Sequence, residues 1–274
     1  MNDLQCVLFE LLKIFIKICE KYKLKYYLVC GSALGAIKYS GFIPWDDDID
    51  VALPRSDYDK FCSVAKRELP ENIFLQNFQT DPEFPHVFSK LRNSNTTFIE
   101  KGTSHLNINH GIYIDVFPLD GYPIKYFQKK VFEINKKILT WKQCCSMKGK
   151  TKIRVLIRNK FFRLLGYHKR TYQTLLKLER LYKSQSLDDS EFWCNYDNYQ
   201  GKLEYAPKWH YGNGVAAKFE GLQVIVPEFY DEYLTQKYGE WRSEPPIDKQ
   251  RSHHFVKIVD TNKSYEYYQN QNKN

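Results

Sequence analysis

Apolar side chains at the start of the chain recur at the spacing of an amphipathic helix. Steps of three and four residues place six of them on one helical face: Leu4, Leu8, Leu11, Phe15, Ile18 and Tyr22. The pattern then changes to YYLVC at residues 26–30, a short β-prone run that Gly31 closes. We expect Ser32 to cap a short helix over residues 33–39 and Gly41 to stop it.

Later apolar runs predict further strands and helices. Residues 50–53 and 112–117 are β-prone runs that end at Pro54 and Pro118, and residues 222–226 form a third such run. Residues 57–69 have the period of an amphipathic helix, and another helix is expected from Pro227 to Tyr238. This order favours an α+β fold in which helices flank a mixed sheet.

Charge is concentrated in one part of the 274-residue chain, whose net charge is +9. Residues 125–183 contain 18 Lys or Arg but only Glu133 and Glu179 as acids, so this segment carries +16 and the rest carries −7. Its apolar residues predict two or three helices with one apolar face, joined near residues 147–150 and 166–168. We therefore expect a main domain of residues 1–124 and 184–268, a basic helical insertion at residues 125–183 and a disordered tail at residues 269–274.

The basic segment has three possible interpretations. It is a solvated basic face, a surface for anionic lipid or a pyrophosphate-linked acceptor, or a nucleic-acid surface. The third ranks below the others because the segment contains none of the usual recognition motifs. We therefore expect no nucleic-acid partner.

Composition excludes several other classes of protein. An aromatic content of 16% is typical of a folded chain, and no run of 18 apolar residues predicts a transmembrane helix. Basic residues interrupt the apolar stretch at residues 6–19, which is not the pattern of a signal peptide. Seven cysteines without a C-x-x-C pair favour a reducing compartment, with neither a disulfide framework nor a zinc ribbon. We expect a cytoplasmic protein.

The sequence GFIPWDDDIDV at residues 41–51 is the first place where chemistry is concentrated. Four aspartates in five positions repel one another unless a cation lies among them. In a strand, Asp48 and Asp50 would lie on one face, roughly 6–7 Å apart, with Ile49 and Val51 turned into the core. Hard divalent cations such as Mg²⁺ prefer such oxygen ligands. The alternative is a solvated acidic turn, which gives no reason for the alternation Asp-Ile-Asp-Val.

Other acidic motifs fit this run poorly. A calcium-binding EF-hand loop that begins at Asp46 would need Gly and Glu where Val51 and Asp57 stand. A D-x-D-x-T phosphatase would need Thr in place of Ala52, and too few residues precede the run for a glycosyltransferase D-x-D. The remaining pattern is that of the nucleotidyltransferase fold. There a Gly-Ser turn and a helix N-terminus approach phosphate while aspartates on the next strand hold metal.

That fold also needs a third carboxylate, which the segment GIYIDVFPLD at residues 111–120 supplies. Asp115 is expected in the middle of a strand between Ile114 and Val116, where an unpaired charge would be costly. Metal ligation or base catalysis would explain it, and an ion pair with a buried Arg or Lys is the alternative. Asp120 is expected to be a cap or turn residue.

These segments resemble a known family. Residues 31–61 (GSALGAIKYSGFIPWDDDIDVALPRSDYDKF) and residues 111–120 are similar to the two signature blocks of the LicD family, the bacterial phosphocholine transferases related to fukutin. The motifs between Phe219 and His254 resemble its C-terminal block. The resemblance covers most of residues 1–120 and 210–256 but not the basic middle. It implies that the main domain is a nucleotidyltransferase-fold catalytic domain.

The resemblance implies a metal-dependent phosphotransferase. Such enzymes move phosphocholine, glycerol phosphate or ribitol phosphate from a CDP-activated donor to a sugar hydroxyl of a cell-surface glycan, and CMP leaves. Asp48, Asp50 and Asp115 would bind Mg²⁺ or Mn²⁺. Gly31 and Ser32 would contact the phosphate of the donor.

Further residues are candidates for substrate binding on the same grounds. Asp46 precedes the metal-binding pair in the same motif and is a weaker candidate. Lys90 and Arg92 would neutralise phosphate charge, unless they belong to a surface strand. His253 and His254 would contact donor or acceptor, although exposed loop histidines are equally consistent with the sequence. Animal relatives hold zinc through clustered cysteines, which this chain lacks.

Two alternatives and one hypothesis about location remain open. The same fold and metal would suit a nucleotidyltransferase that moves NMP from an NTP to a small molecule. A binding protein that has kept the fold is disfavoured because all three acidic residues are present. The implied glycan acceptor, when linked to a lipid pyrophosphate, leads to the hypothesis that the basic insertion contacts anionic lipid at the inner face of the cell membrane.

Overall fold

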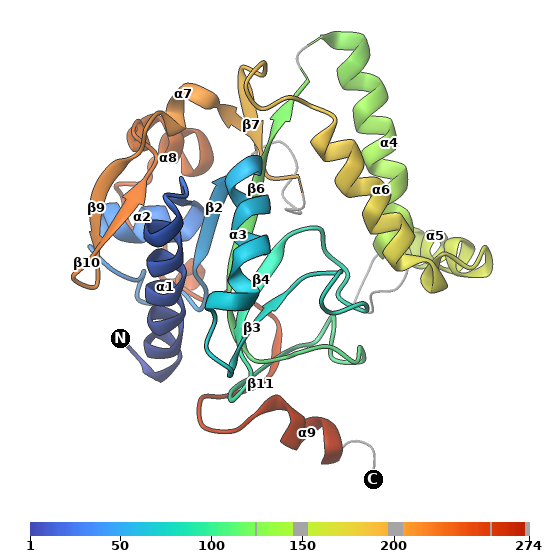
Figure 1. Ribbon diagram of the computed structural model, residues 1–274, viewed down its shortest axis with the longest axis horizontal. Helices are drawn as coiled ribbons and strands as arrows, with labels where there is room; N and C mark the ends of the chain where they lie inside the picture. Colours follow the sequence, from blue (N-terminus) through green and yellow to red (C-terminus); the bar gives the residue numbers. More distant parts are fainter. Residues whose placement is uncertain (124, 145–152, 197–204, 253, 272–274) are drawn as a thin grey trace.

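The computed structural model describes the chain except for residues 124, 145–152, 197–204, 253 and 272–274. It is built from helices around a mixed sheet, so the predicted α+β fold is confirmed (Figure 1). The helices are α1 (Asp3–Tyr22), α2 (Cys30–Lys38), α3 (Arg55–Glu68), α4 (Tyr126–Cys144), α5 (Ile153–Leu164), α6 (Thr171–Lys183), α7 (Lys208–Tyr211), α8 (Tyr230–Tyr238) and α9 (Tyr265–Gln271), with 3-10 turns η1 (Tyr167–Lys169) and η3 (Ile247–Lys249). The strands are β1 (Tyr27–Leu28), β2 (Asp50–Pro54), β3 (Ile73–Gln76), β4 (Ser89–Asn93), β5 (Thr97–Glu100), β6 (Ile112–Tyr122), β7 (Phe192–Cys194), β8 (Tyr205–Pro207), β9 (Val215–Phe219), β10 (Leu222–Val226) and β11 (Val256–Asp260).

The main sheet has the strand order β1-β2-β6-β4-β3. Strands β2 and β6 are parallel, whereas β1 and β4 run antiparallel to their neighbours β2 and β6. Strand β6 continues past the sheet centre and pairs with β7, which pairs with β8. The central strand β6 therefore links the main sheet to the second half of the chain.

Pro118 does not end strand β6, contrary to the prediction. The pairing of β6 with β4 stops at Ser89 and Val116, and its pairing with β7 begins only at Asp120. At Pro118 the strand is therefore bonded on one side alone, to Leu53 of β2. A strand tolerates proline where its missing N–H faces no partner strand.

The two faces of the sheet have different surroundings. Helices α1 and α3 pack against strands β2, β4 and β6 and cover one face (Figure 1). Strand residues alternate between faces, and the alternate residues Phe88, Lys90, Asp115 and Phe117 line a cavity on the other face. The sheet thus separates a helix-covered core from an open site.

Helices α4, α5 and α6 lie within the predicted basic insertion and project from the sheet (Figure 1). Helices α4 and α6 pack together through Phe132, Leu175, Leu178 and Tyr182, a small core separate from that of the sheet. The joint predicted near residues 166–168 is the turn η1, and the joint near residues 147–150 lies outside the described residues. The boundaries of the insertion stay a prediction.

Two predictions about the second half of the chain need correction. Helix α8 begins at Tyr230 rather than at Pro227, because residues 227–229 form the turn that leads out of β10. Residues 269–271 were expected in a disordered tail, but they form the last turn of α9, where Gln269 Nε2 donates to the carbonyl of Ile108. Residues 272–274 lie outside the described part.

Asp120 is neither a cap nor a turn residue but half of a buried ion pair. Its carboxylate accepts two hydrogen bonds from the guanidinium of Arg55, at 2.7 and 2.5 Å, and its side chain is 2% exposed. Arg55 begins α3, so the pair ties that helix to the central strand β6. A buried pair of this kind is costly to break because one charge is left without its partner.

We predict that Asp120→Ala lowers the free energy of unfolding by about 3–5 kcal/mol, because the Arg55 guanidinium stays buried without its partner. Chemical unfolding followed by tryptophan fluorescence measures this loss. The matched control is Asp59→Ala, since Asp59 also faces Arg55, at 3.6 Å, but is 45% exposed. It should lose less than about 1 kcal/mol, and equal losses in the two variants would contradict the prediction.

Candidate active site

Three charged side chains lie side by side where three strands meet. In the sheet, Asp50 of β2 is the register partner of Asp115 of β6, which is in turn the partner of Lys90 of β4. Lys90 Nζ lies 2.9 Å from Asp115 Oδ1. The ion pair considered as the alternative explanation for Asp115 therefore exists, and it lies next to Asp50.

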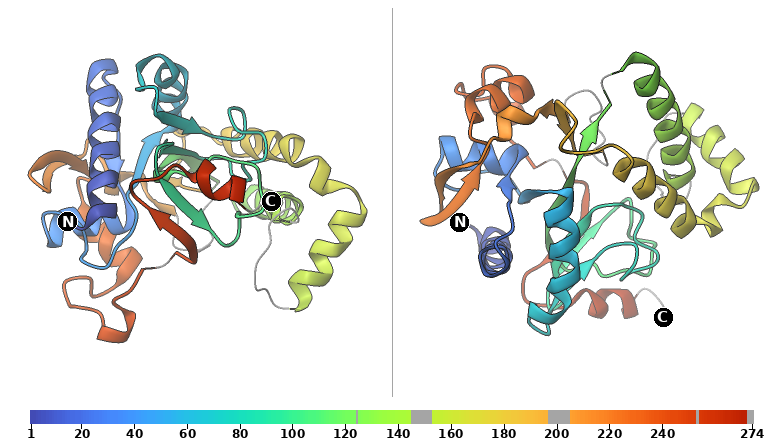
Figure 2. Two further views of the ribbon diagram at one scale, coloured as in Figure 1. Left: turned by 90° about the horizontal axis from the view of Figure 1, so that it is seen from below. Right: turned by 45° about the horizontal axis from the view of Figure 1, so that its top comes forward.

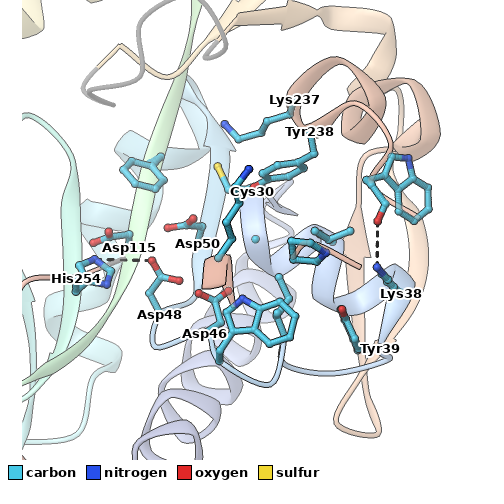
Figure 3. A pocket seen from close by; sticks show the side chains of 18 of the residues that line it. Cys30, Lys38, Tyr39, Asp46, Asp48, Asp50, Asp115, Lys237, Tyr238 and His254 are labelled. Carbon is cyan, nitrogen blue, oxygen red and sulfur yellow. Dashed lines mark hydrogen bonds and ion pairs between the residues drawn. The ribbon is translucent and has the colours of Figure 1, made fainter. Parts of the chain in front are cut away.

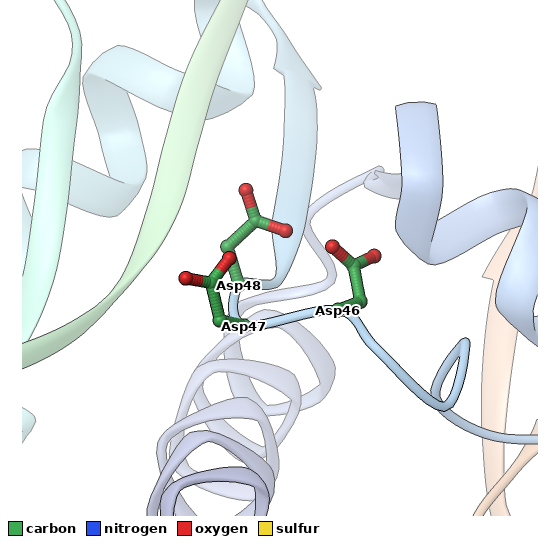
Figure 4. Close-up of side chains that lie close together, drawn as sticks. All are labelled: Asp46, Asp47 and Asp48. Atoms are coloured by element: carbon green, nitrogen blue, oxygen red, sulfur yellow. The ribbon is translucent and has the colours of Figure 1, made fainter. Parts of the chain in front are cut away.

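The acidic run places further carboxylates beside this row. Residues 46–49 belong to no helix or strand and lead directly into β2, so Asp48 precedes the strand instead of lying inside it. Asp46, Asp47 and Asp48 each offer one oxygen, and these three oxygens lie within 4.8 Å of one another (Figure 4). Asp46, Asp48, Asp50 and Asp115 surround one space (Figure 3).

Asp47 has a different role from its neighbours. Its carboxylate accepts a short hydrogen bond from the Ser252 hydroxyl and contacts His254 Nδ1 at 2.9 Å. Both carboxylate oxygens are thereby engaged, and His254 Nε2 comes within 3.9 Å of Asp48 Oδ2. Asp47 therefore fixes the segment around residue 254 against the acidic run.

The close spacing of these acidic groups and His254 shifts their pKa values. Burial, together with the neighbouring Asp48, raises the pKa of Asp46 to about 8. Burial and the charges of Asp48 and Asp115 raise the pKa of Asp50 well above its usual range. Burial alone would lower the pKa of His254, but its hydrogen bond to Asp47 and the charge of Asp48 raise it to about 9. The raised pKa values show that these carboxyl groups resist ionisation when they are crowded together without a cation.

Helix α2 brings Gly31 to the cavity but not Ser32. The helix begins at Cys30, earlier than predicted, and its N-cap is Val29 instead of Ser32. Ser32 is buried within the helix, where its Oγ accepts a hydrogen bond of 2.8 Å from the N–H of Asp50. It therefore fastens α2 to β2, and a role as a phosphate ligand loses support.

Gly31 allows the backbone of α2 to approach the acidic run closely. A Cβ atom at this position would lie 2.8 Å from Asp46 Oδ2, so a side chain would displace that carboxylate. The first N–H groups of a helix have no partner within the helix and attract anions. The place predicted for donor phosphate at Gly31 is consistent with this geometry.

The two basic residues of β4 differ in their positions. Lys90 lines the cavity, with its Nζ 3.3 Å from the centre of the Tyr113 ring. Arg92 is 1% exposed and donates to Gln76 Oε1 and to the carbonyl of Gly111. The prediction that Arg92 neutralises phosphate charge loses its basis, because its guanidinium is engaged inside the protein.

The cavity has a volume of about 870 Å³, and its far wall was not predicted from the sequence. Figure 3 shows Tyr39 and Tyr238 on the side away from Asp115, and Trp45 and Trp241 also line the cavity. His254 lies beside Asp48, whereas His253 lies outside the described residues. Tyr39 and Trp45 precede the acidic run, but Tyr238 and Trp241 come from a distant segment whose proximity the sequence did not predict.

The residues present fit a divalent cation. Asp115 Oδ1 is buried and accepts no well-directed hydrogen bond from the described residues, although Lys90 lies beside it. Asp46, Asp48 and Asp50 face the same space, and carboxylate oxygens are the ligands that Mg²⁺ and Mn²⁺ prefer. Five cysteines are free thiols: Cys6, Cys19, Cys30, Cys62 and Cys194.

Parallel strands that carry aspartates in register, next to a helix N-terminus, define a nucleotidyltransferase-like domain. Residues 23–152 match the family described as LicD/FKTN/FKRP, nucleotidyltransferase domain. The resemblance of the chain to the LicD family is therefore confirmed.

Two curated relatives extend the comparison. The chain is 28% identical over 262 residues to the lipopolysaccharide cholinephosphotransferase LicD of Haemophilus influenzae, which covers 93% of this chain and 96% of that protein. It is also 28% identical over 126 residues to an uncharacterised protein of Rickettsia prowazekii, covering 44% of this chain and 41% of that protein. The similarity to the first relative includes the basic insertion.

We predict that Asp50→Asn stabilises the metal-free protein at pH 7. Because the pKa of Asp50 is raised in the folded state, its carboxyl opposes folding at pH values above the ordinary range of Asp, and this cost disappears as the pH falls to about 4. The melting temperature in EDTA should rise by about 2–4 °C for each kcal/mol of relief, and the gain should vanish near pH 4.

The control for this experiment is Asp59→Asn, which removes an exposed carboxylate outside the cavity. It should not raise the melting temperature at either pH. A lower melting temperature for Asp50→Asn at pH 7 would show that the aspartates do not repel one another in the metal-free protein.

Proposed function

We propose that this protein is a metal-dependent phosphotransferase that moves a phospho-alcohol from a CDP-activated donor to a sugar hydroxyl of a glycan, with release of CMP. The observation that carries the proposal is the register of Asp50 and Asp115 on adjacent parallel strands, with Asp48 and Asp46 facing the same cavity. The relationship over nearly the full length to a lipopolysaccharide cholinephosphotransferase supports the class of reaction.

The aspartates have a defined part in this reaction. Asp48, Asp50 and Asp115 would hold Mg²⁺ or Mn²⁺, with Asp46 as a further ligand. When bound, the ion neutralises phosphate charge and stabilises the leaving CMP. Asp47 is not assigned as a ligand because Ser252 and His254 already engage its carboxylate.

Other residues of the site would bind and orient the donor. Lys90 lies beside Asp115 and would contact phosphate oxygens directly, while the backbone N–H of Gly31 at the start of α2 would receive a second oxygen. His254, held by Asp47, would act as a charged donor of hydrogen bonds because its pKa is raised to about 9. These groups would hold the phosphate close to the aspartates, where alignment matters for phosphoryl transfer.

Choline is the alcohol that the far wall of the cavity fits best. Tyr39 and Trp45 meet edge to face at 6.5 Å, and Tyr238 and Trp241 line the same wall. Aromatic faces attract a quaternary ammonium, and the carboxylate of Glu240 also lines the cavity. Glycerol and ribitol carry no charge for such a wall to attract.

The acceptor and the location are proposed on weaker grounds. A sugar hydroxyl of a cell-surface glycan is proposed by analogy with the relative that acts on lipopolysaccharide. No helix in the described part of the chain is long and apolar enough to span a membrane. A cytoplasmic location at the inner face of the cell membrane stays a prediction.

We predict that the wild-type protein releases CMP from CDP-choline when Mg²⁺ and a glycan acceptor are present, and releases less from CDP-glycerol or CDP-ribitol. Asp50→Asn should reduce release by a factor of about 100 or more, because one carboxylate ligand is lost. Chromatography of the nucleotide products measures both effects.

Asp59→Asn is again the matched control and should retain wild-type activity. Incubation with CTP and phosphocholine tests the alternative of nucleotidyl transfer, and formation of pyrophosphate and CDP-choline would favour that alternative. Normal turnover by Asp50→Asn would contradict the assignment of the metal site.

We predict that EDTA stops CMP release and that added Mg²⁺ or Mn²⁺ restores it, because the cluster of carboxylates needs a cation to accept phosphate. Activity assays before and after dialysis measure the loss and the recovery. A zinc-selective chelator at trace concentration should change neither activity nor the melting temperature, and full activity in EDTA would contradict the proposal.

A further inference from the structure

Exposed apolar side chains are concentrated in the helices between residues 125 and 183. In the described part of the chain, nineteen large apolar side chains are exposed, and ten of them belong to these helices: Phe127, Val131, Ile134, Ile138, Leu156, Ile157, Phe161, Leu164, Leu165 and Tyr172. These helices make up about a fifth of the chain. Such a concentration on a water-facing surface marks an interaction site.

The side chains on α4 form a continuous stripe. Phe127, Val131, Ile134 and Ile138 are separated by four, three and four residues and are 78%, 44%, 57% and 39% exposed. At about 100° per residue they share one narrow face of the helix. The opposite side of α4 carries Phe132, which is buried against α6. The prediction of a single apolar face is therefore wrong for α4, which has an inner and an outer one.

Helix α5 has a broader apolar face that is also exposed. Leu156, Ile157, Phe161 and Leu164 are 53–78% exposed and fall within about 140° of the helix circumference. Figure 1 shows α5 at the outer end of the bundle, beyond α4 and α6. A helix with such an exposed apolar face resembles those that lie in the interface of a lipid bilayer.

Basic side chains flank both apolar faces. Lys130 and Lys137 are exposed beside the stripe of α4. On α5, the exposed Arg154 and Arg163 lie at the two edges of the apolar face, and the exposed Lys160 lies within it. The whole segment of residues 125–183 carries +16. Apolar side chains surrounded by Lys and Arg suit a surface that is apolar within and negatively charged outside.

This charge argues against a second copy of the chain as the occupant. Two copies that met through these faces would bring +16 against +16, and like charges across an interface are repulsive. An anionic bilayer satisfies both features at once, since its lipid head groups pair with the basic residues while its acyl chains receive the apolar ones.

We propose that the outer faces of α4 and α5 are a membrane-docking surface for anionic lipid. Each Lys or Arg near an anionic membrane surface adds attraction, and each inserted apolar side chain adds a contribution that salt does not screen. The combination produces reversible attachment instead of permanent insertion. Docking does not depend on the proposed reaction and can be tested without it.

The placement of these helices relative to the cavity is consistent with the proposal. The left view of Figure 2 shows α1 and α3 at one edge of the molecule. At the opposite edge lie α5 and the segment of residues 237–249, which lines the cavity. Docking through α5 would therefore bring the cavity-lining segment toward the lipid surface.

The test is co-sedimentation of the full-length chain with vesicles of phosphatidylglycerol and phosphatidylcholine, compared with vesicles of phosphatidylcholine alone. We expect binding to the anionic vesicles that weakens between 0.01 M and 0.15 M salt, as the Debye length falls from roughly 30 Å to roughly 8 Å. Two double variants, Phe127→Ser with Ile134→Ser and Phe161→Ser with Leu164→Ser, should each weaken binding by about tenfold. The triple variant Arg154→Glu, Lys160→Glu and Arg163→Glu should weaken binding to anionic vesicles at low salt, because it lowers the net charge of residues 125–183 by six.

Val259→Ser is the matched control, because Val259 is 45% exposed on β11, outside the insertion. It should bind vesicles as the wild type does. Circular dichroism and the melting temperature identify any variant that fails to fold, and the two serine variants on separate helices test the proposal independently. Equal binding to neutral vesicles, no binding to anionic vesicles at low salt, or a dimer in size-exclusion chromatography that the serine variants abolish would overturn the proposal.

Discussion

Repulsion among buried carboxylates is the constraint around which this structure is organised. Asp46, Asp48, Asp50 and Asp115 face one cavity, and the pKa values of Asp46, Asp48 and Asp50 are raised. A chain free to relax would move such groups apart. Here the parallel ladder of β2 and β6 fixes two of them in register, and the Ser32 hydroxyl holds the start of β2 against α2. The protein thus holds an unfavourable arrangement of like charges that a bound cation would relieve.

The sequence predicted the part of the site that is encoded locally. The alternation Asp-Ile-Asp-Val and the mid-strand position of Asp115 were readable because strand period and burial act over a few residues. The role of Asp47, the burial of Arg92 and the continuation of β6 through Pro118 were missed. Each depends on partners distant in sequence, as in the contact of Asp47 with His254, 207 residues away. A single sequence contains no direct signal of such pairings.

For residues 125–183, too, the sequence predicted local features but not the contacts between elements. The charge and the helices of this segment could be predicted, since both are properties of composition and period. The sequence could not predict which apolar face is buried. The helical period of apolar residues indicates that a face exists but not which element packs against it. On α4 the inner face with Phe132 meets α6, while the outer stripe faces away from the protein. The structure therefore shows that the surface of this segment is both basic and apolar, whereas the sequence indicated only its charge.

The contacts of Asp47 with Ser252 and His254 also have a consequence for biosynthesis. A ribosome releases the acidic run long before it releases residues 252–254, and β5 likewise waits for its partner β11. During that interval the nascent site lacks one of its walls, and closing so large a loop costs entropy that only the finished contacts repay. Because cavity-lining residues such as Tyr238, Trp241 and His254 are translated late, the first half of the chain emerges without a complete cavity. The cavity is therefore completed only near the end of synthesis.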